Sequence, residues 1–102
     1  MNVHWTETAE CHLDAIYAYI KRESAIYALR TIDRITKRSQ QVGAFPKSGR
    51  RVPEYDLDKI REVFSDGYRI IYHICPDRID VLAVIHGAMD VLSEEDDQPP
   101  GS

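Results

Sequence analysis

The chain has 102 residues, of which 43% are hydrophobic and 29% charged, and its net charge is -4. This size and composition are typical of one soluble globular domain and exclude a disordered or fibrous chain, and no apolar run approaches the roughly 18 residues of a membrane span. The net charge argues against bulk attraction to nucleic acid, but nine Lys and Arg against two acids in residues 21–51 give a local balance of +7 and predict a cationic face.

The beginning of the chain predicts a strand followed by a helix. Residues 2–6 alternate between apolar and polar, which places Val3 and Trp5 on one face of a short strand. Thr6 can cap the next helix, and two glutamates in the first turn of that helix suit its dipole. Apolar residues then recur at helical spacing to about Arg22, which predicts an amphipathic helix.

A second helix is predicted directly after the first. Ser24 can cap it, and its apolar stripe consists of Ala28, Leu29, Ile32 and Ile35. So short a joint predicts an antiparallel helical hairpin. Residues 43–58 are predicted to be a loop from their Gly, Pro and Asp content.

The second half of the chain predicts a β-meander. Its three strands are expected at residues 59–65, 68–75 and 78–86. Asp66-Gly67 is a strong signal for a two-residue hairpin turn. A short helix is expected from residue 87, and the acidic residues 93–102 are expected to be a disordered tail after a single domain of residues 1–92.

These elements predict an α+β fold. The first strand joins the meander at the sheet edge to give a four-stranded sheet, and the helical hairpin covers one face. The other face has only the loop and the tail to cover it, so we expect function there. The absence of a basic leader or apolar signal core in the first ten residues predicts a cytoplasmic protein. Cys11 and Cys75 form no CxxC spacing and are expected to be reduced thiols in the core.

Four segments together resemble the RelE/ParE toxin superfamily of bacterial type II toxin–antitoxin systems. They are WTETAECHLDAIYAYI, FPKSGRRVPEY, IREVFSDGYRIIYHI and VLAVIHGAMDV. The resemblance extends from Val3 to about Leu92, and the closing HGAMD is more similar to the ParE branch than to the RelE branch. It implies a RelE/ParE-like fold and a toxin that inhibits growth, stabilises plasmids and is neutralised by a cognate antitoxin.

A ParE-like toxin is expected to poison DNA gyrase by binding it and not to be an enzyme. Such binding needs an exposed surface, and the predicted contacts are Lys47, Arg50, Arg51, Arg30, Arg34, Lys37 and Arg38. The alternative for the basic residues of the second helix is an ordinary solvated face. Antitoxin anchors are expected among Tyr17, Tyr19, Tyr27 and the last strand. The toxin is expected to form either a homodimer or a hetero-oligomer with its antitoxin.

The alternative function is that of a RelE-like, ribosome-dependent mRNA endoribonuclease. Metal-free cleavage through the 2'-hydroxyl needs a base, a phosphate clamp and an acid, and the candidates are Glu54, Arg69 and His86. A second turn at Asp77-Arg78 would place Arg69 opposite His86. Arg69 can instead form a structural salt bridge with Glu62, and His86 can simply close a strand.

The sequence also allows a third function and indicates no cofactor. A degenerate toxin that only binds its antitoxin is a third possible function. His4, His12 and His73 form no ligand spacing, so neither a metal nor another cofactor is expected.

Overall fold

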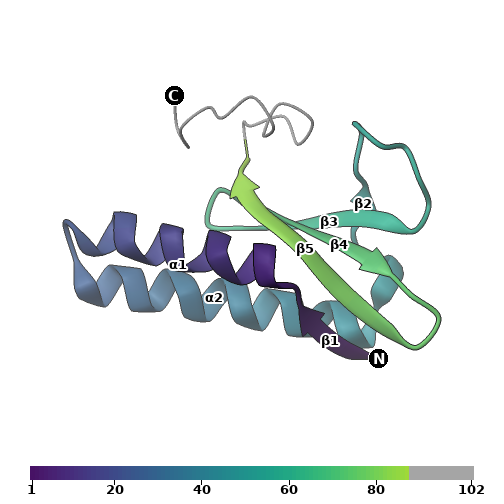
Figure 1. The fold of residues 1–102 in the computed structure, drawn as a ribbon, viewed down its shortest axis with the longest axis horizontal. Helices are drawn as coiled ribbons and strands as arrows, with labels where there is room; N and C mark the ends of the chain where they lie inside the picture. Colours follow the sequence, from purple (N-terminus) through teal and green to yellow (C-terminus); the bar gives the residue numbers. More distant parts are fainter. Residues whose placement is uncertain (88–102) are drawn as a thin grey trace.

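The computed structural model describes residues 1–87 of the chain (Figure 1). Its elements are β1 (Asn2–Trp5), α1 (Glu7–Lys21), α2 (Ala25–Ala44), the 3-10 helix η1 (Pro46–Ser48), β2 (Arg50–Arg51), β3 (Ile60–Ser65), β4 (Tyr68–Ile74) and β5 (Arg78–His86). The predicted terminal helix after Gly87, the domain boundary at residue 92 and the acidic tail lie outside the described residues.

Both helices begin at the residues that the sequence predicts as caps. The Ala9 N–H donates to Thr6 Oγ1 at 3.2 Å, and the Tyr27 N–H donates to Ser24 Oγ at 3.1 Å. These bonds satisfy backbone donors that have no partner within the helix. Thr6 Oγ1 also donates to the Val81 carbonyl at 2.7 Å, so the start of α1 is fixed to β5.

The sheet has five strands in the order β1-β5-β4-β3-β2, where four were predicted. The additional strand is β2, in which Arg50 pairs with Glu62 and Arg51 with Arg61. A two-residue strand of two arginines has no apolar alternation, so the sequence pattern does not indicate it. As predicted, β1 joins the sheet at an edge, where it runs parallel to β5.

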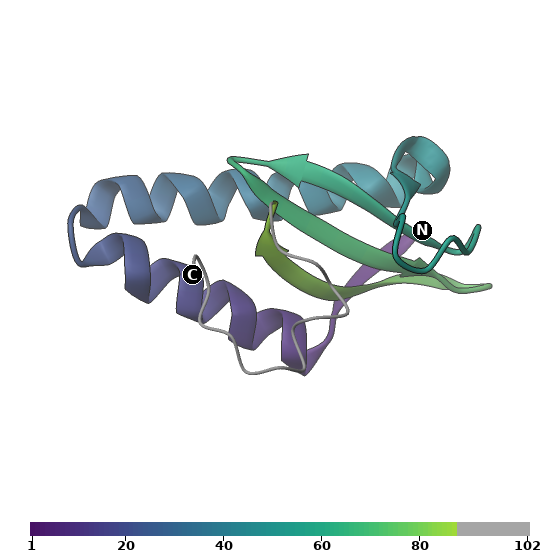
Figure 2. The same ribbon diagram turned by 90° about the horizontal axis from the view of Figure 1, so that it is seen from above.

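The helical hairpin packs on one face of the sheet and extends beyond it (Figures 1 and 2). The core between the layers includes Ile16, Ile35, Ile70, Tyr72 and Val84. Outside this core the helix stripe differs from the prediction, because Leu29 is 59% exposed in the overhanging part of α2. No helix among residues 1–87 is both long and apolar enough to cross a membrane.

The β3–β4 turn agrees with the sequence prediction. Asp66 and Gly67 have φ values of 53° and 83°, as a two-residue turn with two left-handed positions requires. Ser65 therefore pairs with Tyr68, as predicted.

The predicted register between β4 and β5 is wrong. Arg69 pairs with Ile85, and His86 pairs with Tyr68. Two features cause the difference: residues 75–77 connect the strands, with Cys75 opposite Arg78, and Leu82 is left unpaired at a β-bulge. A one-residue change of register moves a side chain to the other face of the sheet, so Arg69 and His86 lie on opposite faces.

The two cysteines also differ from the prediction. Cys11 is exposed on α1, and Cys75 is partly exposed after β4, so neither belongs to the core. Both are free thiols, as expected.

Candidate functional site

Arg69 lies buried on the sheet face opposite the helices, between two carboxylates. Its Nε donates to Glu62 Oε1 at 2.6 Å, and its two Nη atoms donate to Glu54 at 2.8 and 2.9 Å. The hydrogen bonds with Glu54 and, to a smaller extent, with Glu62 raise the pKa of Arg69. The second oxygen of Glu62 accepts a hydrogen bond from Arg50 Nε. Arg69 is therefore a salt-bridged arginine, one of the two roles that the sequence predicts for it.

This ion-pair network holds the loop between β2 and β3 against the sheet. Glu54 belongs to the loop, whereas Glu62 and Arg69 belong to β3 and β4. Next to the network, Val52 packs in a second apolar cluster with Ile71, Ala83 and Ile85. The loop therefore covers part of the sheet face opposite the helices, as the sequence predicts.

The three candidate nuclease residues are not brought together. Glu54 and Arg69 are in direct contact. His86 lies on the helix side of the sheet, where its ring contacts Tyr68 edge-on at 6.1 Å between centroids. The arginine and the acid of the nuclease hypothesis are thus separated by the sheet.

The basic loop is less cationic than its sequence suggests. Lys47 lies 3.5 Å from Asp58, and Arg51 lies 3.6 Å from both Asp56 and Asp58. The hydrogen bond from Arg61 and the charge of Lys47 lower the pKa of Asp58, so this carboxylate stays ionised. These acids follow residue 51 in the sequence and fold back onto the basic residues, which a charge count along the chain cannot detect.

The basic side of α2 is more cationic than the loop that carries Lys47, Arg50 and Arg51. Its members recur at helical spacing: Arg30, Arg34, Lys37 and Arg38. Arg34 binds Asp66 of the β3–β4 turn at 3.0 Å, and Lys37 binds Asp33 of its own helix at 2.9 Å. Within residues 1–87 no ion pair involves Arg30, which is exposed. The face keeps positive charge at its surface.

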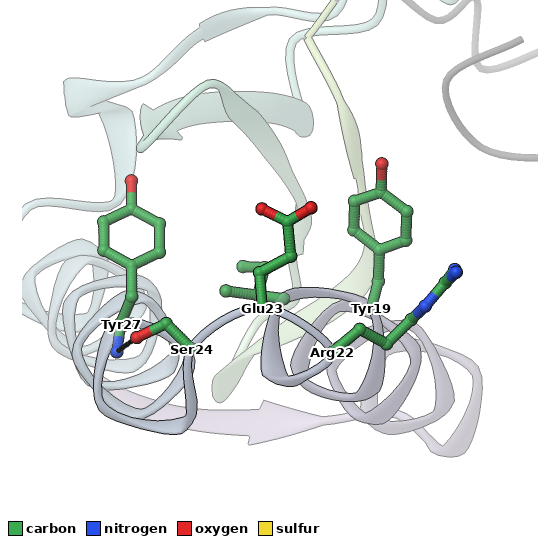
Figure 3. Close-up of a pocket in the computed structure, with 6 residues that line it drawn as sticks. Tyr19, Arg22, Glu23, Ser24 and Tyr27 are labelled. Atoms are coloured by element: carbon green, nitrogen blue, oxygen red, sulfur yellow. Dashed lines mark hydrogen bonds between the residues drawn. The ribbon is translucent and has the colours of Figure 1, made fainter.

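An aromatic groove, which we define by Tyr19 and Tyr27, lies at the overhanging end of the helical hairpin. Its volume is about 780 Å³, and its lining consists of Tyr19, Ile20, Arg22, Glu23, Ser24 and Tyr27. Figure 3 shows the two tyrosine rings on either side of the Glu23 carboxylate, pointing to the same side. Tyr19 is 66% exposed and Tyr27 is 52% exposed.

The aromatic groove borders the sheet. Burial, together with the proximity of Tyr19 and Tyr27, raises the pKa of Tyr68 at the start of β4. Tyr17, the third predicted antitoxin anchor, is half-buried outside the groove lining, and the Lys21 ammonium lies 5.6 Å from its ring centre.

The last strand, the other predicted anchor, is flanked on both sides over its first half. There β1 and β4 pair with it, and β1 reaches only as far as Val81. Further along, the Val84 N–H donates to His12 Nδ1 of α1 at 3.2 Å. At this position α1 satisfies a donor that a partner strand would otherwise use.

Phe64 is an exposed aromatic residue on the loop side that the sequence analysis does not single out. Phe64 is 46% exposed on β3, and the Arg50 guanidinium lies 5.1 Å from its ring centre. The only sequence signal is the register of the first hairpin, which places Phe64 on the same face as Arg69.

Comparison with known proteins identifies one family and one fold. The family model described as "ParE toxin of type II toxin-antitoxin system, parDE" matches residues 3–91. A solved structure described as "Chromosomal ParDE TA system from P. aeruginosa" is similar at a TM-score of 0.70 and 20% identity, over 84% of this chain and 95% of that chain. No curated protein matches the chain. The predicted α+β fold and the predicted family are confirmed.

Proposed function

This chain belongs to the family of ParE toxins of type II toxin–antitoxin systems, and from this membership we propose that it inhibits growth by binding DNA gyrase in the cytoplasm. It is the toxin component of such a system, and its partner is a cognate antitoxin. We propose gyrase as the target, and the contact residues and the form of the complex are proposals as well.

We favour binding over catalysis because Arg69 and His86 lie on opposite faces of the sheet. A nuclease would need its cation and its acid on the same side of the scissile phosphate. Here the cation is held by Glu54 and Glu62, and the acid lies across the sheet. Inhibition through a bound surface makes no such demand, so the observed geometry is compatible with it.

We assign the gyrase contact to the basic side of α2 and to the neighbouring basic loop. The residues are Arg30, Arg34, Lys37, Arg38, Lys47, Arg50 and Arg51, as predicted from the sequence. Within this set the α2 residues contribute most of the attraction, because acids of the β2–β3 loop offset much of the loop's charge.

We assign the antitoxin contact to the aromatic groove. Further apolar side chains are exposed on α2 at this end of the hairpin, outside the groove lining: Ile26 is 67% exposed and Leu29 is 59% exposed. Exposed apolar patches mark interaction sites, and tyrosines are frequent at their energetic centres. An amphipathic helix of the antitoxin suits a groove of this kind, with an apolar residue between the two rings.

Reversing two charges on α2 should weaken gyrase binding and toxicity. We expect Arg30→Glu with Lys37→Glu to reduce gyrase affinity roughly 10-fold or more, because like charges across an interface are repelled. Lys37 and Asp33 are both well exposed, so their ion pair contributes little to stability. Pull-down of gyrase and growth after induction of the toxin measure the effect.

The matched control changes the net charge equally at other sites. Lys21→Glu with Lys59→Glu leaves the α2 face intact and should retain both gyrase binding and toxicity. Equal losses in the two double variants would contradict the assignment to α2. Arg50→Glu is unsuited to this test, because it would place a carboxylate next to the buried Glu62.

A further inference from the structure

A second polar cluster lies on the same sheet face as Arg69, at the other end of β4. Its members are His73 in β4, Cys75 in the β4–β5 connection and Asp80 in β5. His73 and Asp80 are paired across the two strands, so their side chains share a face. His73 and Asp80 are partly exposed, and the Cys75 ligand position lies buried between them.

The potential ligand atoms of this cluster already have metal-site spacing. They all lie within 4.8 Å of one another. Cys75 Sγ lies 3.6 Å from His73 Nδ1 and 3.5 Å from Asp80 Oδ2. Tetrahedral Zn²⁺, with bonds of about 2.3 Å to sulfur and about 2.0–2.1 Å to nitrogen and oxygen, separates such ligand atoms by roughly 3.5 Å. An ion could therefore bind with only small side-chain movements.

Two neighbouring residues support the same site. Arg78 Nε donates to Asp80 Oδ1 at 2.8 Å and its Nη2 makes a longer contact of 3.4 Å with Oδ2, the oxygen that the sulfur approaches. A ligating carboxylate is commonly oriented by such an outer hydrogen bond. His4 is the partner of Asp80 on β1, so His4, Asp80 and His73 form one row across three strands.

We propose that His73 Nδ1, Cys75 Sγ and Asp80 Oδ2 bind one divalent transition-metal ion, Zn²⁺, with His4 as the fourth ligand. A thiolate and imidazoles favour Zn²⁺ over Mg²⁺ or Ca²⁺, which take oxygen ligands. Cys75 donates its thiol proton to Asp80, and the ion replaces that proton when it binds. The bound ion joins the β4–β5 connection to β1 and is independent of gyrase and antitoxin binding.

Titration of the purified full chain with Co²⁺, in the presence of a thiol-free reductant, tests the proposal. We expect one Co²⁺ per chain, with visible absorption of a tetrahedral ion and a near-ultraviolet thiolate-to-cobalt charge-transfer band. Zn²⁺ should displace Co²⁺ and abolish both. Absence of a charge-transfer band in the wild-type chain would overturn the proposal.

Variants assign the ligands. Cys75→Ser should remove the charge-transfer band, whereas Cys11→Ser, the matched change at the exposed cysteine of α1, should retain it. His73→Ala, Asp80→Asn and His4→Ala should each weaken Zn²⁺ affinity roughly 10-fold or more in competition with a chromophoric chelator. A band that survives Cys75→Ser, or affinity unchanged by the His73 and Asp80 variants, would overturn the site. Unchanged affinity in His4→Ala would remove His4 from it.

Thermal stability provides a readout that does not depend on spectroscopy. Zn²⁺ should raise the melting temperature of the wild-type chain and of Cys11→Ser, because a ligand that binds the folded state stabilises it. Zn²⁺ should leave the melting temperature of the Cys75→Ser variant unchanged. The same increase in Cys75→Ser would contradict binding at this cluster.

Discussion

Arg69→Ala is expected to destabilise the protein by about 3–5 kcal/mol, because it removes the arginine that pairs with Glu54 and one of the two arginines that pair with the buried Glu62. The Glu62 side chain is 0% exposed and that of Arg69 is 5% exposed. A small domain has a total stability of about 5–15 kcal/mol, so this change should remove a large part of it. Urea unfolding followed by circular dichroism measures the effect. Toxicity should fall because folded toxin is lost.

Two further variants distinguish the stability lost with the ion pair from the stability lost by shortening an arginine side chain. Arg69→Met with Glu62→Leu and Glu54→Gln removes the charges of all three groups and should recover much of the stability, since replacing a complete buried ion pair is often neutral. Arg78→Ala removes an exposed arginine from the neighbouring strand and should leave the stability close to that of the wild-type chain, because exposed ion pairs contribute little. If Arg69→Ala kept wild-type stability but lost toxicity, Arg69 would contact the target and would not be structural.

Loss of Tyr19 and Tyr27 is expected to disrupt antitoxin binding. Each alanine substitution should cost about 2 kcal/mol at the centre of an interface, which is roughly a 30-fold loss of affinity. The double variant should bind up to roughly 1000-fold more weakly if the two rings act independently. Both side chains are well exposed, so the fold should be retained. Calorimetric titration with the antitoxin measures the affinity.

Phe45→Ala is the matched control for this prediction. Phe45 is 71% exposed at the end of α2, away from the hairpin turn, so its loss should not affect antitoxin affinity. Cells that hold the antitoxin should tolerate Phe45→Ala but should stop growing with the double tyrosine variant. Equal affinity losses in both variants would contradict the assignment of the groove.

Local signals were sufficient to predict most of the fold. Thr6 and Ser24 cap the two helices because their oxygens accept the first free N–H groups, and Asp66-Gly67 adopts the left-handed turn that these residue types permit. The register of β4 and β5 was not predictable in this way. It depends on the length of the second connection and on a bulge at Leu82, neither of which has a distinct sequence signal.

The candidate sites were predicted less completely, because their residues come together only through folding. The salt bridge of Arg69 with Glu62 followed from the first hairpin register, but the contact with Glu54 depends on the path of the loop. The acids that offset Arg51 lay outside the window of the charge count. His4, His12 and His73 form no ligand spacing along the chain, and His73 comes to face Asp80 only because β4 pairs with β5.

A gyrase assay on the purified toxin tests most directly whether the toxin acts by binding gyrase. Toxin is added to gyrase with plasmid and, in parallel, to a translation extract, with and without antitoxin. We expect cleaved plasmid in the gyrase reaction, less of it when antitoxin is present, and intact messages in the translation extract. Truncated messages with normal supercoiling would contradict it and favour the nuclease. Normal supercoiling with intact messages and tight antitoxin binding would also contradict it and indicate a degenerate toxin.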